Sequence, residues 1–330
     1  MEFFTQVPSR DSALISTLRA IAETKTFSLE ELTFVSLGNV GAAIGTISQA
    51  ISSQTSVRRL KLNGYSDIAR LAGSAKDLPF LEELEVKGIF ADALELKHDD
   101  LGFRSLTTFA VLGSPEMIHS LLRSIGSNRL SRIALLVSAW GVGEVHRGMI
   151  AELQRFRLHL ANLRLEVGGR LSWEVLEPAL NLAELHTFDL ECAQTDSNVI
   201  TNEQLRRMVD AWPNLTQLRL QLSCKHITLG SLAYIATHCP NLRKLAITFD
   251  ARATSNLPAS QNVKNFVLSK NALELFDVMA SKFDQGDEER SANVFRSWWP
   301  QARLCRSDPA DPRPMRYWEI DDAPIWPNGD

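Results

Sequence analysis

The sequence predicts an α/β fold built as a right-handed solenoid, with short parallel strands on its concave face and helices on its convex face. Three observations lead to this prediction. An apolar motif recurs along most of the chain, its apolar positions alternate as in a strand, and the residues between successive motifs carry the start signals of helices. Each unit of such an array packs only on its neighbours, so the chain is expected to form one elongated body.

The recurring motif is a leucine-like residue followed by a second after three positions and by a third after two more. Its first positions lie 24 to 30 residues apart, at the long end of the range for leucine-rich repeats. The nine copies are Leu29-Leu32-Phe34, Val57-Leu60-Leu62, Leu81-Leu84-Val86, Leu106-Phe109-Val111, Leu130-Ile133-Leu135, Leu160-Leu163-Leu165, Leu185-Phe188-Leu190, Leu215-Leu218-Leu220 and Leu242-Leu245-Ile247. A tenth, degenerate copy is predicted at Val263-Phe266-Leu268.

The last two apolar residues of each motif point to the same side of a strand, and the residues between and beside them point to the opposite side. That opposite side is the concave face, which Glu31, Thr33, Val35 and Asn63 share at its start. Both charge signs mix there, which suits a protein ligand better than a phosphate backbone. The predicted partner-binding residues are Arg59, Lys61, Glu83, Glu85, Lys87, Arg132, Arg164, Glu166, Asp189, Glu191, Gln217, Arg219, Gln221 and Lys244.

The stretches between motifs predict helices by their first residues. Ser114 offers an N-cap, followed by Pro115 at the first helical position and by an early acid. Thr201 and Gln204 have the spacing of a capping box, and Thr228 precedes apolar residues at helical spacing in the same way. A doubly wound α/β domain would also alternate strands and helices, but it usually carries a glycine-rich phosphate turn, and none is evident in the sequence.

The ends of the array are predicted to be capped, because an outermost repeat otherwise exposes its apolar face. Residues 1–28 are expected to form an N-terminal capping helix over 12–25, and residues 29–270 the repeats. Residues 271–305 are expected to form a C-terminal cap, with one helix over Leu273–Phe283 and a second that Pro300 ends. Residues 306–330, rich in proline and acids, are expected to form an extended tail.

Charge and composition exclude several classes of function. With 35 basic and 39 acidic residues the formal charge is −4, which makes nucleic-acid and membrane partners unexpected. No basic segment precedes an apolar run at the start, and no apolar stretch is long enough for a membrane helix. The four cysteines are widely scattered rather than dense, which predicts a reducing compartment, cytoplasmic or nuclear. We expect a monomer.

We expect no enzyme, cofactor or metal site. Cys224, His226, His238 and Cys239 could supply zinc ligands, but the second pair is adjacent and lies at the far end of a predicted helix, so Cys239 is expected to be a buried apolar residue. The glycines around Gly141 lack the lysine of a phosphate loop. A hydrolytic site assembled only by the fold remains the alternative.

The segment from Ile227 to Leu245 resembles the cysteine-containing class of leucine-rich repeats. The residues that carry the resemblance are Ile227-Thr228 and Cys239-Pro240-Asn241-Leu242 before Leu245, echoed by Trp212-Pro213-Asn214-Leu215 and Leu78-Pro79-Phe80-Leu81. This class is typical of F-box proteins, and the irregular spacing is similar to the F-box-like sets of basidiomycete fungi. The resemblance implies a substrate receptor of a ubiquitin ligase, which would bind its target on the repeats and a Skp-type adaptor and cullin through an F-box.

The chain departs from that family in two ways. The first repeat already begins at Leu29, which leaves no room for an F-box before it, so an F-box is expected only upstream of Met1. The second cysteine or asparagine of the class is mostly missing. The alternative is therefore a repeat scaffold that acts alone and has no connection to ubiquitin.

Overall fold

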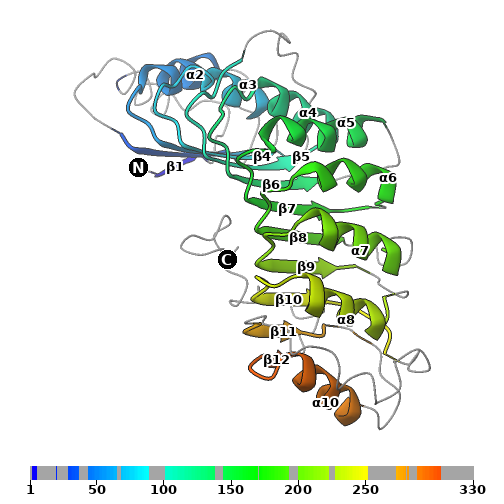
Figure 1. Cartoon of the computed structure of the whole chain (residues 1–330). Helices are drawn as coiled ribbons and strands as arrows, with labels where there is room; N and C mark the ends of the chain where they lie inside the picture. The colour runs from blue at the N-terminus through cyan, green and yellow to red at the C-terminus, as the bar shows by residue number, and fades with distance from the viewer. Residues whose placement is uncertain are drawn as a thin grey trace. The chain divides into compact units, whose positions relative to one another are not determined.

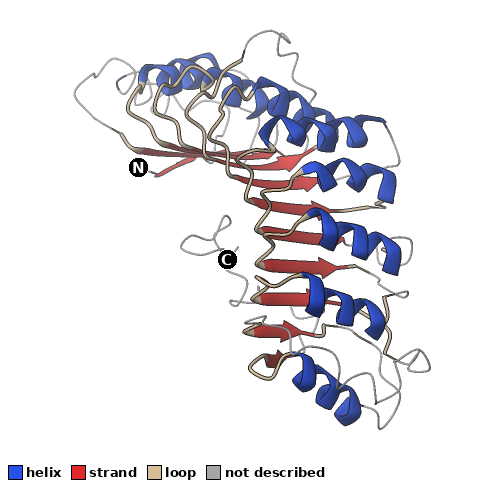
Figure 2. Ribbon diagram, in the orientation of Figure 1, coloured by secondary structure: helices blue, strands red, loops and turns tan. Residues whose placement is uncertain are grey.

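The computed structural model describes residues 2–5, 20, 29–36, 44–64, 68–88, 101–137, 144–169, 171–192, 200–222, 227–251, 273–279, 281 and 288–305. The chain forms two compact units, Met1–Leu160 and Ala161–Asp330. In both units the helices lie on one side of the strands (Figure 2).

In the first unit, parallel strands pair in chain order, each with the next (Figure 1). The strands are β1 (Glu2–Thr5), β2 (Glu31–Ser36), β3 (Arg59–Gly64), β4 (Glu83–Gly88), β5 (Thr108–Gly113) and β6 (Arg132–Val137). The helices are α2 (Ile44–Ser53), α3 (Ile68–Ser74), α4 (Pro115–Ser124), α5 (Glu144–Glu152) and the 3-10 helix η1 (Leu153–Phe156).

The second unit repeats this arrangement with parallel strands that also pair in chain order. Its strands are β7 (Asn162–Val167), β8 (Thr187–Cys192), β9 (Gln217–Gln221), β10 (Lys244–Ile247), β11 (Leu275–Asp277) and β12 (Arg303–Cys305). Its helices are α6 (Trp173–Leu176), the 3-10 helix η2 (Glu177–Asn181), α7 (Asn202–Ala211), α8 (Leu229–His238) and α10 (Glu288–Trp298).

The motif residues form the core of each unit at the predicted register. Leu60 pairs with Leu32 and Leu84 on the neighbouring strands, and Leu218 pairs in the same way with Phe188 and Leu245. In all nine strands β2–β10, the second and third residues of the motif are at most 7% exposed. Each unit is therefore an α/β leucine-rich-repeat solenoid, right-handed as parallel strand–helix–strand connections are.

Two predicted helix caps are confirmed, and a third differs. Ser114 Oγ accepts a hydrogen bond from the Met117 amide at the start of α4. Thr201 and Gln204 form the reciprocal capping box of α7. Thr228 stands at the N-cap of α8, but its side chain makes no capping bond. Instead Asn202 of the preceding helix accepts from the Thr228 amide at 3.0 Å, so one repeat caps the next.

The structure corrects the prediction for both ends. β1 is a strand in register with β2 that the sequence reasoning did not predict. The helix predicted over Leu273–Phe283 is wrong, because β11 occupies Leu275–Asp277 and adds to the sheet. The motif Leu273-Phe276-Val278 supplies this strand, and the proposed copy at Val263-Phe266-Leu268 lies outside the described residues. So do the tail 306–330 and all of the N-terminal helix 12–25 except Ala20, which is helical.

An aromatic cluster closes the C-terminal end of the second core. Phe276 of β11 packs edge-on against Phe295 of α10, with ring centroids 5.0 Å apart, and against Trp299 at 5.1 Å. Phe249 packs edge-on against Phe295 at 5.7 Å. All four rings are at most 2% exposed. The predicted cap is therefore a helix that covers the last strands with large aromatic surfaces.

Candidate functional site

The side chains that face away from the helices form three rows across each sheet. They occupy the first, third and fifth positions of the strands, between the buried motif residues. All fourteen predicted partner-binding residues lie in these rows. Arg59, Lys61, Glu83, Glu85, Lys87 and Arg132 lie on β3, β4 and β6, and Arg164, Glu166, Asp189, Glu191, Gln217, Arg219, Gln221 and Lys244 lie on β7–β10.

The rows of the first unit contain small, separate ion pairs. Glu31 forms ion pairs with Arg59 at 3.4 Å and with Lys61 at 3.3 Å, and Glu85 pairs with Lys87 at 2.9 Å. The Glu31 group is more than a third exposed, so each of its pairs is worth at most about 1 kcal/mol. The Glu31 pairs therefore hold one another weakly and leave much of their surface to water, whereas Glu85 beside Lys87 is only 13% exposed.

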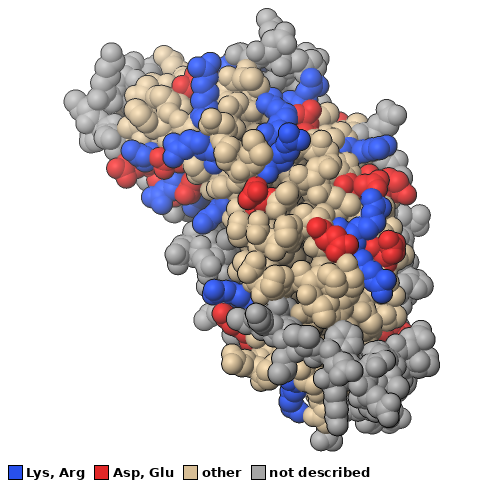
Figure 3. Space-filling view, viewed as in Figure 1, with Lys and Arg blue, Asp and Glu red and all other residues tan. Residues whose placement is uncertain are grey.

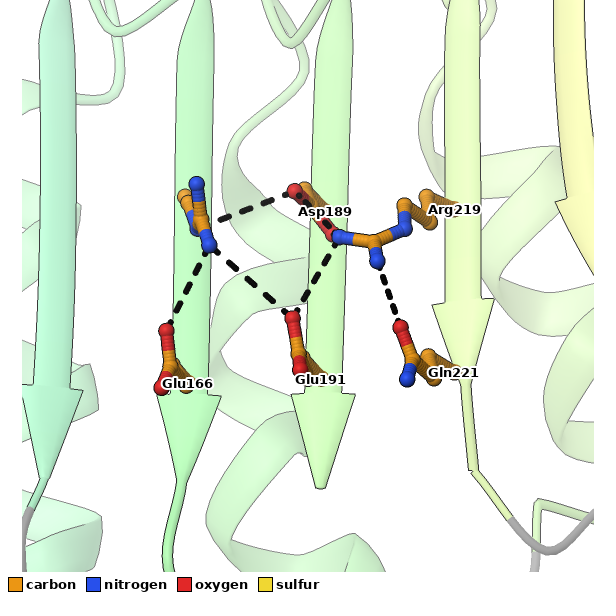
Figure 4. A network of polar contacts seen from close by, with 6 residues as sticks. Glu166, Asp189, Glu191, Arg219 and Gln221 are labelled. Atoms are coloured by element: carbon orange, nitrogen blue, oxygen red, sulfur yellow. Dashed lines mark hydrogen bonds and ion pairs between the residues drawn. The ribbon is translucent and has the colours of Figure 1, made fainter. Parts of the chain in front are cut away.

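The second unit instead carries one connected network, called here the arginine network (Figure 4). Its members come from three adjacent strands, β7, β8 and β9, and all of their side chains lie on the open face. They are Arg164, Glu166, Asp189, Glu191, Arg219 and Gln221.

Arg219 is the most enclosed cation of the network. Its Nη1 lies 3.3 Å from Asp189 Oδ1 and 3.4 Å from Glu191 Oε2, and its Nη2 donates to Gln221. The side chain is 16% exposed. Burial by itself lowers the pKa of Arg219, but the carboxylates of Asp189 and Glu191 outweigh burial and leave the pKa above its ordinary value. Arg219 is therefore a fixed positive charge that holds two carboxylates in place.

Arg164 joins the same carboxylates from the other side. It contacts Glu166 at 3.4 Å on its own strand, and Asp189 and Glu191 at 3.8 and 3.9 Å on the next strand. Three carboxylates thus share two guanidinium groups. Burial raises the pKa of Glu166, and the Glu191 carboxylate raises it further, while Arg164 opposes both. Glu166 pairs with Arg164 alone, whereas Asp189 and Glu191 each contact both arginines.

The sequence reasoning missed the open-face residues of β5 and β6. Thr108, Ala110 and Leu112 follow the same alternation as the predicted residues, and so do Ala134 and Leu136 beside Arg132. The sequence did indicate these positions, because the motif Leu106-Phe109-Val111 places Thr108, Ala110 and Leu112 on the opposite side of the strand. The predicted partner-binding residues have only charged and amide side chains, so they do not include this apolar part of the face.

The histidine and cysteine group is not assembled by its described members. Cys239 is buried at the C-cap of α8, as predicted, and burial raises its pKa to about 12. His238 is exposed and stacks on Tyr234 with ring centroids 3.7 Å apart. Cys224 and His226 lie outside the described residues, as do Gly141 and Gly143. Within the described ranges, no group of three or more histidine, cysteine or acidic side chains could hold a metal ion.

Charges of both signs are interspersed on the face that Figure 3 shows. Acidic and basic side chains alternate across it rather than gathering into one basic or one acidic patch. Among the helices that the structure describes, none is long and apolar enough to span a membrane.

Comparison with known proteins adds little to this geometry. No protein-family profile matches the chain, and no curated protein matches it by sequence. A structure of a Bacteroides fragilis protein has a TM-score of 0.45 at 13% identity, covering 74% of this chain and 75% of that one. TLR13, solved in complex with ssRNA13, has a TM-score of 0.41 at 15% identity. This alignment covers 78% of the present chain, which spans only 40% of the TLR13 chain. Both likenesses are loose, and the fold assignment rests on the strand order and register.

Proposed function

We propose that this chain is a protein-binding leucine-rich-repeat module that holds a partner on the open face of its sheets and carries out no catalysis. The observation that supports it most is the composition of that face. The described helices all lie on the other side of the strands, while the open rows combine fixed charges with half-buried apolar side chains. Protein interfaces have this mixture, with charged groups around an apolar centre.

Site-specific photo-cross-linking tests this proposal. A photoreactive residue at Asn63 or Gln217 lies on the open face of the first or second unit, and one at Gln49 or Glu203 lies on exposed helix surface of the same unit. In cell extract we expect the same protein to be captured from one or both open-face positions and from neither helix position. Capture only from the helix positions, or equally from all four, would refute the proposal.

A more specific role is the target-binding part of an F-box-like ubiquitin-ligase receptor. The observation that favours it is the Cys-Pro-Asn-Leu segment, whose Cys239 is buried where α8 turns toward β10. The role also fits a cytoplasmic or nuclear protein, because the three described cysteines are thiols rather than disulfides. Purification from the source cell, with any upstream coding sequence included, should then recover a Skp-type adaptor and a cullin. Recovery of the target without an adaptor or a cullin would indicate a repeat scaffold that has no connection to ubiquitin.

A hydrolytic enzyme is the alternative from another class. It would need a nucleophile hydrogen-bonded to a base beside a pocket. The arginine network instead joins arginines to carboxylates and to one side-chain amide. Reaction of the purified chain with an activity-based hydrolase probe would favour the enzyme.

A further inference from the structure

We propose that the edge of the first unit at which the strands begin is a second interaction surface, which binds an acidic protein segment that also carries apolar side chains. This edge lies outside the open face, so the proposal goes beyond the function proposed above and does not depend on it. The surface is called here the turn edge, and it consists of exposed side chains from the turns before β4, β5, β6 and β7. They are Phe80, Leu101, Arg104, Arg129, Arg157 and Leu158.

Exposed apolar side chains gather on the turn edge. Phe80, Leu101 and Leu158 are 55%, 47% and 70% exposed, and in the part of the chain that the structure describes they are the exposed large apolar side chains. Apolar residues scattered singly over a surface are ordinary, whereas several on one edge indicate a surface that a partner covers. All three are accessible to such a partner.

Hydrogen bonds hold the first three turns side by side. Ser105 Oγ donates to the Pro79 carbonyl at 2.6 Å, which joins the turn before β5 to the turn that carries Phe80. The Gly126 amide donates to the Gly102 carbonyl at 2.8 Å, which joins the turn before β6 to the residue after Leu101. The turns are therefore spaced like the strands that they lead into, about 4.8 Å from one to the next.

Arg155 ties the fourth turn to the third. Its guanidinium donates to the Ile125 carbonyl at 2.9 Å and to the Arg123 carbonyl at 3.1 Å. Arg157 and Leu158 follow two and three residues later, so they lie close to the turn before β6. The backbone of the turn edge is thus fixed before a partner arrives, and binding need not order it.

The arginines of the turn edge are not compensated by the described acids. Arg104, Arg129 and Arg157 are exposed, and they belong to none of the ion pairs formed among the described residues. The turns 101–107, 125–131 and 157–160 contain these three arginines and no Asp or Glu. By contrast, Arg58 in the turn before β3 pairs with Glu82. A carboxylate that reaches the turn edge would find guanidinium groups able to donate two parallel hydrogen bonds each.

An acidic segment with apolar side chains fits both kinds of group. Its carboxylates would pair with the arginines, and its apolar side chains would cover Phe80 and Leu101. The distance from the turn before β4 to the turn before β6 is about 10 Å, which about three extended residues span. A flat anionic membrane fits less well, because it would also approach the exposed Asp77 beside Phe80 and a chain whose formal charge is −4.

Peptide selection on the whole chain tests the proposal. A displayed library of random dodecapeptides is selected on the full-length wild type and on the edge variant, Arg104→Glu with Arg129→Glu. The matched control is the helix variant, Arg70→Glu with Arg147→Glu, which makes the same change of charge on exposed surface of α3 and α5. We expect the wild type and the helix variant to enrich peptides that combine acids with Leu, Ile, Met, Phe or Trp, and the edge variant not to enrich them.

Binding of a selected peptide gives the quantitative readout. By fluorescence anisotropy, the edge variant should weaken the peptide by about tenfold or more, because two ion pairs are lost and two repulsions are added. The helix variant should change its Kd less than about twofold, since distant surface charges are screened by salt. Phe80→Ser with Leu101→Ser should also weaken binding, because less apolar surface is covered. Circular dichroism confirms that each variant is folded.

Two results would overturn the proposal. One is the enrichment of peptides without acids, or equal binding of the selected peptide to the wild type and the edge variant. The other is cosedimentation of the wild type with vesicles of phosphatidylserine and phosphatidylcholine that the edge variant loses, which would assign the turn edge to a membrane. Neither result affects cross-linking from Asn63 or Gln217, which tests the open face separately.

Discussion

The open faces of the two units have the same backbone and carry their charges in different ways. In the first unit the ion pairs are separate, those of Glu31 are more than a third exposed, and Arg132 stands beside alanines and leucines. In the second unit Arg164 and Arg219 are enclosed by carboxylates on adjacent strands. Charges that already pair with one another gain little from a partner, because a partner must replace contacts that exist. The difference teaches that two repeat faces with many charged residues can differ in how much of that charge is already compensated within the fold.

The largest effect is expected in the core, where the two units are alike. Leu60→Asp and Leu218→Asp each place a carboxylate at a position that is 0% exposed. The lost apolar burial costs about 1.5 to 3 kcal/mol, and burying the charge adds to it, so both variants should unfold the affected unit. Thermal melting followed by circular dichroism measures this. Gln217→Asp, beside Leu218 on the open face, should melt like the wild type, and unchanged melting of Leu218→Asp would show that the register is wrong.

A smaller loss of stability is expected to differ between the open faces of the two units. Arg219→Met leaves Asp189 and Glu191 with less compensation, and we expect a loss of about 2 kcal/mol, below the value for a fully buried pair because Arg219 keeps 16% exposure. Arg59→Met in the first unit should cost less than about 1 kcal/mol. Denaturant unfolding measures both. Equal losses would mean that the arginine network is no more than a set of surface pairs.

The pH dependence of Glu166 gives the smallest effect. Burial raises its pKa in the folded chain, so the folded state binds the proton more tightly than the unfolded state does. The ionised carboxylate therefore opposes folding above its folded pKa, and this penalty disappears as the pH falls through that pKa toward the unfolded value. Glu166→Gln should melt at the same or a slightly higher temperature at pH 7.5, with the difference shrinking toward pH 4. A variant that melts lower at pH 7.5 would show that the ionised form stabilises the fold.

The sequence predicted the repeats well because the spacing of the apolar residues in each motif shows which residues of the strand point into the core. Leu218 and Leu220 can be recognised as core, and Arg219 as open-face, from alternation alone. The partners of Arg219 could not be predicted, since they depend on which long side chains of neighbouring strands meet. The error at Leu273–Phe283 has a similar cause. The first two motif positions, Leu273 and Phe276, are three apart, and this spacing also fits a helix.

The most direct test of the whole account is carboxyl footprinting of the full chain with and without the protein that cross-linking captures. Carbodiimide coupling to glycine ethyl ester, read by mass spectrometry, reports the accessibility of each carboxylate. Glu83 and Glu191 lie on the open faces of the two units, and Glu116 and Glu203 lie on exposed helix surface. The account predicts that the partner lowers labelling at Glu83, at Glu191 or at both, and leaves Glu116 and Glu203 unchanged. Protection of the helix carboxylates with both open-face carboxylates still labelled would contradict it.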